Sequence, residues 1–341
     1  MKTLVTGANG LLGSNVVREL LNRGHEVKAL VRKGADTRTL KGLDVEFFYG
    51  DLLEKEQLAG ACEGCDYVIH SAGKIAGLQT KFSDFSEINI QGTKNIVKAA
   101  EAAGVKRMVH VSSNCVFSGG TLEEPGTELS EFTGFRFNSG YVNSKYLAQQ
   151  WVLSEVEKTG FPIVVVNPTI MIGPYDAKPG SSDIILKVLK DQLQLCPEGG
   201  KNFVDARDAA VATCNALTMG TPGECYLLTG ENLTFAELFG RINRIYGKSA
   251  MRLLVPATIL KGAGLVGNAI RAIVHHDIPL NLVNMRQLAY ESYFSGNKAI
   301  RVLKLQQRPI DDAIRDAISW FISNGYLKPS LERETFVPAA A

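Results

Sequence analysis

A tyrosine and a lysine four residues apart form the pair in this sequence best suited to proton transfer. They bound the segment Tyr141-Val142-Asn143-Ser144-Lys145. Residues i and i+4 share one face of a helix, so the two side chains would lie together there. A free tyrosine has a pKa of about 10, and a neighbouring ammonium favours the phenolate and lowers that value. We therefore expect Tyr141 to act as a general acid or base assisted by Lys145.

Two serines end a β-rich run upstream of this pair, in the segment Val111-Ser112-Ser113-Asn114. In open α/β sheets the carboxyl ends of the strands face the ligand crevice. A hydroxyl group there can donate to a carbonyl oxygen and stabilise negative charge on it. Because successive strand side chains point to opposite faces, only one of the serines can serve. We assign this role to Ser113 and a structural role to Ser112.

Three glycines with the spacing GxxGxxG follow the first apolar run, in Thr6-Gly7-Ala8-Asn9-Gly10-Leu11-Leu12-Gly13. Gly7 would permit a tight turn, and Gly10 would let a pyrophosphate approach the amides of a helix N-terminus. Gly13 would let that helix pack closely on the strand. A position between a strand and a helix is the context that a dinucleotide loop requires. A purely structural turn is the alternative.

The end of the second predicted strand bears on which dinucleotide binds. It reads Ala29-Leu30-Val31-Arg32-Lys33, with two cations where an NAD-preferring site usually has an acidic residue. Arg32 can pair with a 2′-phosphate through forked hydrogen bonds, which predicts NADP(H) rather than NAD(H). The alternative is that both cations are solvated loop residues. Asp51-Leu52 follows the third strand, where Asp51 could accept from the exocyclic amine of adenine.

Short β-rich runs alternate with helical stretches through the first half of the chain. The predicted strands are Thr3–Thr6, Glu26–Val31, Val45–Tyr49, Tyr67–Ser71, Arg107–Ser112 and Ile163–Asn167. The predicted helices between them are Ser14–Asn22, Glu56–Ala61, Asn89–Ala103 and Val142–Lys158. This alternation is typical of βαβ units in a parallel sheet covered on both faces. We predict an α/β fold: a Rossmann-type doubly wound parallel sheet with a smaller, mainly helical C-terminal substrate lobe.

The regular alternation ends after Pro168, where turn signals appear. Further helices are predicted at Asp183–Lys190, Phe203–Leu217, Thr234–Tyr246 and Ile310–Ile322, with a strand at Glu224–Leu228. We assign residues 1–172 and about 203–230 to a nucleotide-binding core. Residues 173–202 and 231–335 form the predicted substrate-binding lobe, and the tail 336–341 is expected to be frayed.

The most apolar later stretch, Leu253–Val274, does not have the composition of a membrane span. It is interrupted by Pro256, Lys261, Asn268 and Arg271, which a span would rarely carry. The favoured interpretation is a buried or substrate-side helix pair, and the alternative is contact with an interface.

Composition is ordinary for a globular enzyme, with 341 residues, 45% of them hydrophobic and 21% charged. The net charge of +2 gives no argument for nucleic acid or a membrane surface as the main partner. The N-terminus lacks the long apolar core of a signal peptide, so we expect a cytoplasmic protein. Cys62-Glu63-Gly64-Cys65 is a single CxxC without further ligands nearby, so we expect no metal site and cysteines that stay reduced.

Taken together, these motifs resemble the extended short-chain dehydrogenase/reductase superfamily over roughly residues 1–330. The resemblance includes His70-Ser71-Ala72-Gly73 and Asn167-Pro168 besides the motifs above. Leu30-Val31-Arg32, Trp320-Phe321 and Ile310-Asp311-Asp312-Ala313 look most like its dihydroflavonol-4-reductase-like branch. That branch includes cinnamoyl-CoA reductases, 3β-hydroxysteroid dehydrogenases and relatives described as sugar epimerases.

The resemblance implies Ser113, Tyr141 and Lys145 as a catalytic triad. The implied cofactor-binding residues, besides Tyr141 and Lys145, are Gly7, Asn9, Gly10, Leu11, Leu12, Arg32, Asp51, Leu52, Ala72, Gly73 and Pro168. Asn89 would be either structural or part of a proton relay. Gly73 stands where the family often has alanine, and residues 122–137 form a partly acidic insertion expected to cover the site.

Three functions remain open at this stage. The first is an NADP(H)-dependent reductase or dehydrogenase acting on a carbonyl or secondary alcohol. The second is a nucleotide-sugar epimerase or dehydratase with retained NAD, which Arg32 argues against but Arg241, Arg244, Arg252 and Arg271 leave open as diphosphate ligands. The third is a nonenzymatic NADP(H) sensor, and such relatives often lack the tyrosine. A small-molecule substrate is expected in the first two, and family members are often homodimers.

Overall fold

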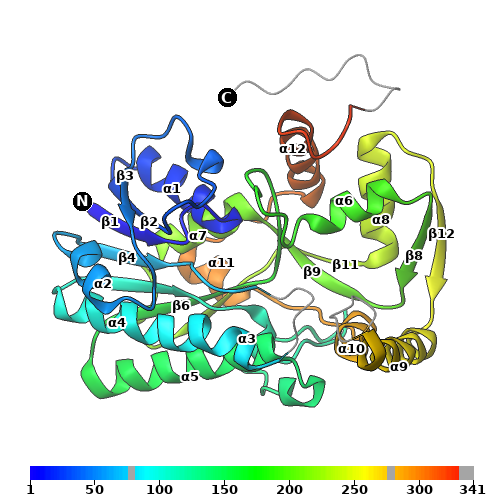
Figure 1. Ribbon diagram of the computed structural model, residues 1–341, viewed down its shortest axis with the longest axis horizontal. Helices are drawn as coiled ribbons and strands as arrows, with labels where there is room; N and C mark the ends of the chain where they lie inside the picture. Colours follow the sequence, from blue (N-terminus) through cyan, green and yellow to red (C-terminus); the bar gives the residue numbers. More distant parts are fainter. Residues whose placement is uncertain (76–80, 275–280, 330–341) are drawn as a thin grey trace.

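A seven-stranded parallel sheet forms the centre of the protein. The computed structural model describes residues 1–75, 81–274 and 281–329, except for the side chains of 271–274. The sheet has the order β10-β6-β5-β4-β1-β2-β3 (Figure 1). Its strands are β1 (Lys2–Thr6), β2 (Glu26–Val31), β3 (Glu46–Tyr49), β4 (Tyr67–His70), β5 (Arg107–Val111), β6 (Ile163–Pro168) and β10 (Cys225–Leu228). All neighbouring pairs are parallel, so the predicted doubly wound α/β fold is confirmed.

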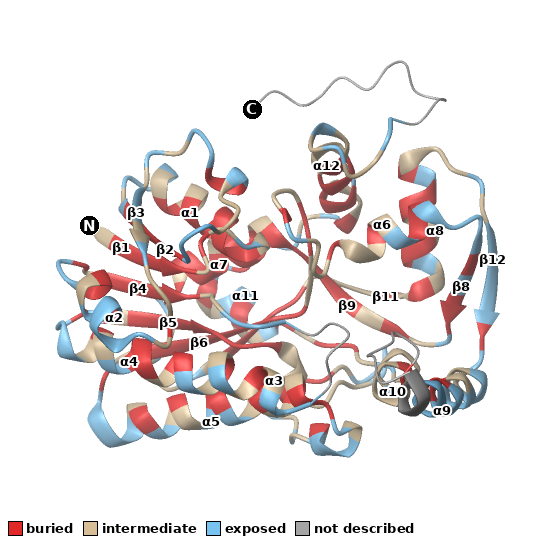
Figure 2. Ribbon diagram, viewed as in Figure 1, coloured by how far each residue is buried: buried red, intermediate tan, exposed pale blue. Residues whose placement is uncertain are grey.

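Helices cover both faces of this sheet, and the two cores follow from the alternation of the strands. One face packs against α1 (Leu11–Asn22) and α7 (Ala206–Asn215) through residues such as Val5, Ile69 and Val109. The other packs against α2 (Lys55–Cys62), α4 (Thr93–Ala102) and α5 (Gly140–Thr159) through Leu4, Val68 and Met108. Odd and even strand residues therefore divide between the two sides, and all strands except the exposed edge strand β3 are almost entirely buried (Figure 2).

The segment between β4 and α4 is helical but irregular. Helix α3 (Ser83–Ser86) runs into the π-helix η2 (Glu87–Gly92), which continues directly as α4. The 3-10 turns η1 (Arg38–Leu40), η3 (Asn114–Val116) and η4 (Gly134–Phe137) lie in other connections. A π-turn inside a helix is rare and is frequently found at functional sites. The helix predicted to start at Asn89 therefore starts earlier, and Asn89 lies inside the π-turn.

Helices are abundant in the C-terminal part, as predicted, but two small sheets lie among them. One has the order β11-β9-β7, from β7 (Ile170–Ile172), β9 (Gly200–Asp205) and β11 (Glu231–Thr234). The other pairs β8 (Leu193–Pro197) with β12 (Met251–Val255). The helices are α6 (Asp183–Lys190), α8 (Phe235–Tyr246), α9 (Ala257–Val274), α10 (Leu282–Leu288), α11 (Asn297–Leu303) and α12 (Ile310–Ser323).

Two predictions for this part were wrong in detail. The helix expected from Phe203 begins at Ala206, because Phe203–Asp205 completes β9 and Asp205 caps α7 by accepting from the Arg207 amide at 2.8 Å. The stretch from Leu253 is not a helix pair, since it begins in β12 and continues as the single helix α9. No helix among the described residues is long and apolar enough to cross a membrane. The predicted frayed tail lies outside the described residues.

Candidate active site

The glycine loop between β1 and α1 has the close contacts that only glycine permits. Gly7 has a φ of +68°, and a Cβ there would lie 2.7 Å from the backbone of Ala72. A Cβ at Gly13 would lie 2.1 Å from the carbonyl oxygen of Gly7. Gly10 donates its amide to the Gly7 oxygen at 2.9 Å and caps α1. The loop is therefore a compressed turn that holds the start of α1 against the end of β1.

The N-terminus of α1 is open to an anion. Its cap residue, Gly10, offers no side-chain hydrogen bond, and its first turn carries no acidic residue. The amides of Leu11 and Leu12 begin this helix, where the dipole favours negative charge. The side chain of Asn9 is used elsewhere, because its Nδ2 donates to the Asp36 carbonyl at 2.8 Å. The loop thus fits a pyrophosphate through its backbone and the open helix end.

Arg32 and Lys33 follow directly after β2, beside the glycine loop. Both are exposed, and neither forms an ion pair with another described residue. The loop beyond them contains a pair that the sequence analysis did not weigh, in which Arg38 Nε lies 2.8 Å from Asp36 Oδ2. Asp36 also accepts from the Arg38 amide, and these bonds lower the pKa of its carboxyl group. The Arg38 guanidinium is thereby occupied, which leaves Arg32 as the better placed cation.

Asp51 and Leu52 lie after β3, in a turn that precedes α2. Asp51 Oδ1 accepts from the Leu53 amide at 3.0 Å, which fixes the orientation of the carboxylate. Leu52 is buried against Gly92 of the π-helix, and its carbonyl accepts from Asn95 Nδ2 at 2.9 Å. Contacts of Leu52 therefore link this turn to η2 and α4, the helical segment that follows β4 in the chain.

The loop after β4 contains Ala72 and Gly73 and faces the glycine loop. The Ala72 amide donates to Thr6 Oγ1 at 3.2 Å. A Cβ on Gly73 would lie 3.2 Å from Asn89 Oδ1, so the space beside Gly73 is bounded by that amide. Asn89 itself accepts from the Lys74 amide and donates to the Lys74 carbonyl and to Ser144 Oγ. These bonds join the loop to α5 and show a structural role for Asn89.

Ser113 lies at the carboxyl end of β5, next to Tyr141. It is buried, and its Oγ accepts from the Cys115 amide at 3.3 Å, which caps the turn η3. Its carbonyl accepts from Asn167 Nδ2 at 2.9 Å, and this anchors the end of β5 to β6. Ser112 is also buried, and its hydroxyl has no partner among the described residues. The structure thus brings the side chain of Ser113 close to Tyr141.

Tyr141 lies in the first turn of α5, where Ser139 caps the helix. Its ring packs edge-on against Phe85, with the centroids 5.9 Å apart. Burial raises the pKa of Tyr141 above the usual tyrosine value, the nearby Cys115 adds to that rise, and the hydrogen bond with Ser113 opposes it. The predicted lowering of this pKa by Lys145 is therefore not found in the protein alone. At neutral pH the phenol is protonated.

Lys145 lies one turn further along α5 and is buried. Its Nζ donates to the Val111 carbonyl at 2.9 Å, at the end of β5. This bond directs the ammonium towards the end of β5. Burial lowers the pKa of Lys145 to about 8, and Cys115 opposes that change. The lysine is therefore cationic at neutral pH but close to its titration range.

Pro168 ends β6 at the same edge of the sheet, so it lies at the level of Ser113. The residue before it, Asn167, donates to the Ser113 carbonyl and, at 2.7 Å, to Gln149 Oε1 of α5. The strand end, the serine and the tyrosine helix are thus joined by a single amide. The sequence analysis quoted Asn167 only as part of a motif and did not assign it this role.

A second feature that the sequence analysis missed is a buried polar network beneath the site. His70 lies between two threonines, with Nδ1 2.7 Å from Thr6 Oγ1 and Nε2 3.1 Å from Thr93 Oγ1. Thr93 donates to the Asn89 carbonyl inside the π-turn. Burial and the charge of Lys145 lower the pKa of His70 to about 3, so the ring is neutral. The network links the start of the glycine loop to the helical segment opposite α5.

The insertion at residues 122–137 is bound to both parts of the protein. Gly120 and Gly126, at its edges, pair with Tyr293 and Phe294 through isolated β-bridges. Phe132 stacks on Tyr146 of α5 at 3.8 Å between centroids, and Phe137 packs against Tyr290. The insertion therefore connects the beginning of α5 with the segment that follows α10. Its last residue, Phe137, precedes Tyr141 by four positions, and the expectation that the insertion covers the site stays a prediction.

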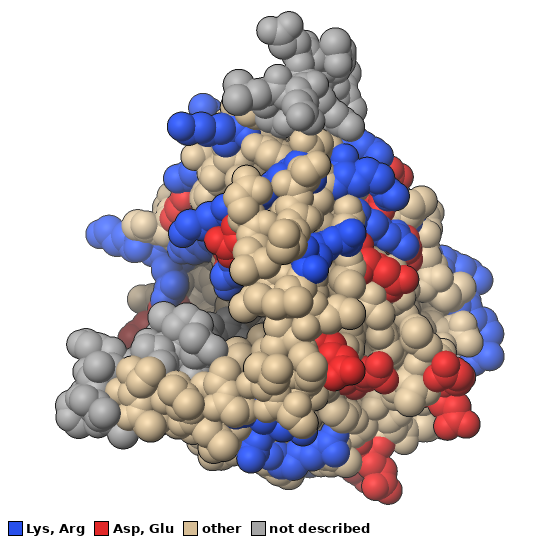
Figure 3. All heavy atoms as spheres, turned by 90° about the vertical axis from the view of Figure 1, so that its right-hand side faces the viewer, with Lys and Arg blue, Asp and Glu red and all other residues tan. Residues whose placement is uncertain are grey.

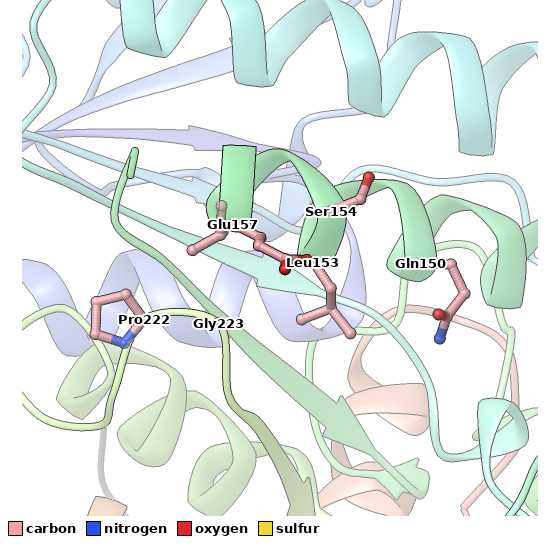
Figure 4. A pocket seen from close by; sticks show the side chains of 7 residues that line it. Gln150, Leu153, Ser154, Glu157, Pro222 and Gly223 are labelled. Atoms are coloured by element: carbon pink, nitrogen blue, oxygen red, sulfur yellow. The ribbon is translucent and has the colours of Figure 1, made fainter. Parts of the chain in front are cut away.

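A hollow on the outer side of α5 has no part in this constellation. It has a volume of about 450 Å³ and is lined by Gln150, Leu153, Ser154, Val156, Glu157, Pro222 and Gly223 (Figure 4). Tyr141 and Lys145 lie at the opposite end of α5 from these residues. No group of three potential metal ligands is found among the described residues. Burial raises the pKa of the thiols of Cys62, to about 12, and Cys65, which makes both unreactive.

With this geometry established, the chain can be placed in a class of proteins. The model of the NAD-dependent epimerase/dehydratase family matches residues 3–228. The protein belongs to this family, and hence to the extended short-chain dehydrogenase/reductase superfamily of Rossmann-fold oxidoreductases.

Its relatives include both reductases and enzymes of sugar nucleotides. Sterol demethylase protein B of Methylococcus capsulatus is 30% identical, over 96% of this chain and 100% of that protein. A putative dihydroflavonol 4-reductase of Synechocystis is 31% identical, over 95% of both chains. A nucleoside-diphosphate-sugar epimerase from Pseudomonas aeruginosa has the same architecture, with a TM-score of 0.79 and 25% identity over 96% of this chain and 99% of that one.

Proposed function

We propose that the protein is an NADP(H)-dependent reductase or dehydrogenase that acts on a carbonyl compound or secondary alcohol, with Tyr141 as general acid and base. One observation carries this proposal: Ser113, Tyr141 and Lys145 converge where the carboxyl end of β5 meets the amino end of α5. The glycine loop opens at the same edge of the sheet, because β1 and β5 are separated only by β4. The resemblance of the motifs to reductases of the superfamily supports the same assignment.

The residues divide the work of carbonyl reduction between them. The bound cofactor supplies the hydride, which adds to the carbonyl carbon and moves an electron pair to the oxygen. Tyr141 gives its phenolic proton to that oxygen, and the O–H of Ser113 donates to it as negative charge develops. Lys145 keeps a positive charge near the tyrosinate that results. In the oxidation direction, the same tyrosinate takes the proton from the alcohol.

The choice of NADP(H) over NAD(H) rests on the end of β2. Arg32 is exposed, adjoins the glycine loop and has no carboxylate partner among the described residues. A guanidinium in this position can bind a phosphate with two parallel hydrogen bonds, whereas a ribose hydroxyl would gain little from it. We also propose that Gly7, Gly10, Leu11 and Leu12 contact the pyrophosphate through their backbone. Asp51 and Leu52 would adjoin the adenine.

Three arginines that could have held a nucleotide diphosphate are already engaged, which weakens the epimerase alternative. Arg241 pairs with Glu231 at 2.7 Å and with Asp311, and Arg244 pairs with Asp311 at 2.6 Å. Arg252 donates to the Ala236 carbonyl at 2.9 Å. The side chain of the fourth arginine, Arg271, is not among those that the structure describes. The exposed Arg136, which lies over the ring of Tyr290 at 4.6 Å, is a cation still available on the substrate side.

We propose that the substrate is bound mainly by residues 173–202 and 231–335, of which 330–335 lie outside the described residues. The core of 1–172 with about 203–230 contains the whole seven-stranded sheet, which supports this division. A nonenzymatic sensor is disfavoured, because such a protein would not need the Ser113–Tyr141 pair beside a buried lysine.

The proposal is tested by measuring NADPH oxidation against a panel of carbonyl compounds and nucleotide sugars. For any substrate found, Tyr141→Phe is expected to keep NADPH binding and to lose nearly all turnover. Tyr146→Phe is the matched control on the same helix, because the contacts of Tyr146 are with the rings of Phe132 and Phe135, and the variant should retain its turnover. Turnover that survives in Tyr141→Phe would refute the mechanism. Epimerised product without net NADPH consumption would favour the alternative.

A further inference from the structure

The apolar side chains that remain exposed are concentrated on one surface. Among the described residues, twenty large hydrophobic side chains are exposed, and nine of them lie within residues 193–195 and 251–270. They are Leu193, Leu195, Met251, Leu253, Leu254, Ile259, Leu265, Val266 and Ile270; all of these except Leu254, which lies on the opposite side of the small sheet, form what we call the apolar face. Scattered single residues of this kind are normal on a protein surface, whereas a contiguous patch marks an interaction site. The clustering therefore indicates that this surface binds another molecule or surface.

The register of the small β8–β12 sheet builds the first half of this face. Met251 is paired with Leu193, and Leu253 is paired with Leu195. Side chains at alternate positions share one side of a sheet, so these four form a continuous apolar layer. The intervening residues of β8, Gln194 and Cys196, are buried on the other side. Met251 is 73% exposed, so nothing in the described structure covers this layer.

Helix α9 builds the second half and reverses the usual pattern of a surface helix. Gly264 and Gly267 face the protein, and a Cβ on Gly264 would lie 2.8 Å from the Cα of Leu282 in α10. Leu265 and Val266 are about 60% exposed on the other side. A globular helix normally turns its large apolar residues inwards. The expectation that 253–274 is buried is thus wrong, whereas its other form, a substrate-side position, stays a prediction, and the alternative of an interface fits the structure.

The charge of this region is one-sided. Residues 245–276 contain Lys248, Arg252, Lys261 and Arg271 but no aspartate or glutamate. Acidic residues adjoin this stretch: Asp191 lies near Lys248, Asp277 follows in the sequence, and the Glu198 carboxylate accepts from the Ala257 amide at the start of α9. Figure 3 shows this side of the molecule, where a broad uncharged area is bordered by lysine and arginine side chains and, on the right of the view, by aspartate and glutamate side chains. The balanced charge of the whole chain conceals this local excess.

We propose that the apolar face docks on the surface of an anionic lipid membrane. Large apolar side chains beside lysine and arginine suit the boundary between acyl chains and anionic headgroups. A second copy of the chain is a poorer match, because two identical faces would bring their cations together. Nothing in this proposal requires the assigned chemistry, so it stands or falls independently of the proposed function.

The docked orientation would place the substrate side of the protein near the lipid. Helix α10 packs against α9, and the segment after it contacts the insertion beside Tyr141 through the Tyr290–Phe137 pair. The membrane-facing elements are thus connected by two contacts to the insertion that is predicted to cover the candidate active site.

The test is cosedimentation of the full chain with vesicles. Binding is expected to vesicles of equal parts phosphatidylcholine and phosphatidylglycerol, and to fall with added salt and with phosphatidylcholine alone. Leu265→Glu and Leu253→Glu should each weaken binding by roughly tenfold or more, since both would place a charge in the acyl region. Lys261→Gln should weaken it about fivefold, the effect of one basic residue at such a surface.

Leu129→Glu is the matched control, because Leu129 is 94% exposed but lies outside the apolar face. It should bind vesicles as the unaltered protein does, and all variants should keep the melting temperature and NADPH binding of the parent. The proposal is overturned if the parent stays in the supernatant with anionic vesicles, or if the two leucine variants sediment like Leu129→Glu. A parent that is dimeric by light scattering, and that Leu265→Glu turns into a monomer without vesicle binding, would instead make this face a protein interface.

Discussion

Gly13 provides the sharpest test of how closely α1 must pack on β1. A Cβ at this position would lie 2.1 Å from the Gly7 oxygen, 2.8 Å from the Gly7 carbonyl carbon and 2.9 Å from the Ala8 Cα. All three are backbone atoms, so no side chain can rotate to make room. In Gly13→Ala the helix must move away by more than ~1 Å to restore ordinary van der Waals distance.

The expected cost follows from two opposing effects. Inserting a methyl group into a packed contact costs about 1–3 kcal/mol, whereas replacing glycine by alanine inside a helix gains about 1 kcal/mol. We expect a net loss of up to about 2 kcal/mol in stability, towards the upper end because the clash is with backbone atoms. The shift also carries the amides of Leu11 and Leu12 away from the pyrophosphate position. A misplacement of about 1 Å can cost up to a hundredfold in a preorganised site, so NADPH affinity should fall about tenfold or more.

The assays are thermal unfolding and a fluorescence titration with NADPH. Gly262→Ala is the control, because it lies inside α9 and a Cβ there would meet nothing within 4 Å. It should raise stability slightly through helix propensity and leave the titration unchanged. Gly10→Ala should give an intermediate result, since its Cβ would lie 3.3 Å from the Gly7 oxygen. If Gly13→Ala behaves like Gly262→Ala in both assays, the loop is not compressed as described.

Two further predictions concern the cations of the site. The pKa of Lys145 is lowered to about 8, so the lysine loses its charge as the pH rises through that value, and kcat/KM should decline above it. In Lys145→Arg, any activity that remains should lack this decline. A profile of the parent protein that stays flat well above pH 8 would contradict the assignment. Arg32→Ala should weaken NADPH binding by tenfold or more while changing NADH binding little, because only NADPH carries the 2′-phosphate. Equal weakening of NADPH and NADH binding would show that Arg32 does not bind that phosphate.

The core of the fold was predictable because its signals are local and repeated. Each of the six strands predicted before Pro168 is found, with boundaries correct to within one or two residues. Buried parallel strands are continuous apolar runs, and glycines such as Gly24 and Gly104 end the preceding helices with positive φ. The small strands β7, β8, β11 and β12 were missed. Strands of three to five residues such as these depend on partners far away in the sequence, as in the pairing of Leu193 with Met251.

The candidate site was predictable only where a residue type has a single role in a known pattern. The glycine loop and the Tyr141–Lys145 spacing are of this kind. The supporting contacts were not, because they join segments distant in sequence. Asn167 donates to Ser113 across 54 positions, and His70 contacts Thr6 across 64. The error over the pKa of Tyr141 has the same origin, since the helical spacing showed that Lys145 was near but showed neither the burial of the phenol nor the bond from the Lys145 ammonium to the Val111 carbonyl.

That bond bears on whether the hydride leaves with the product or returns to the same molecule. With Lys145 directed at Val111, burial keeps the Tyr141 phenol protonated, and Ser113 offers a second hydroxyl. In the proposed function, the protonated phenol of Tyr141 therefore donates its proton to a carbonyl oxygen, as carbonyl reduction requires. An epimerase must first oxidise its substrate, and the same tyrosine would have to be ionised against the cost of burial before each cycle. We propose net reduction on this basis, and the engagement of the arginines by Glu231, Asp311 and the Ala236 carbonyl supports the same choice.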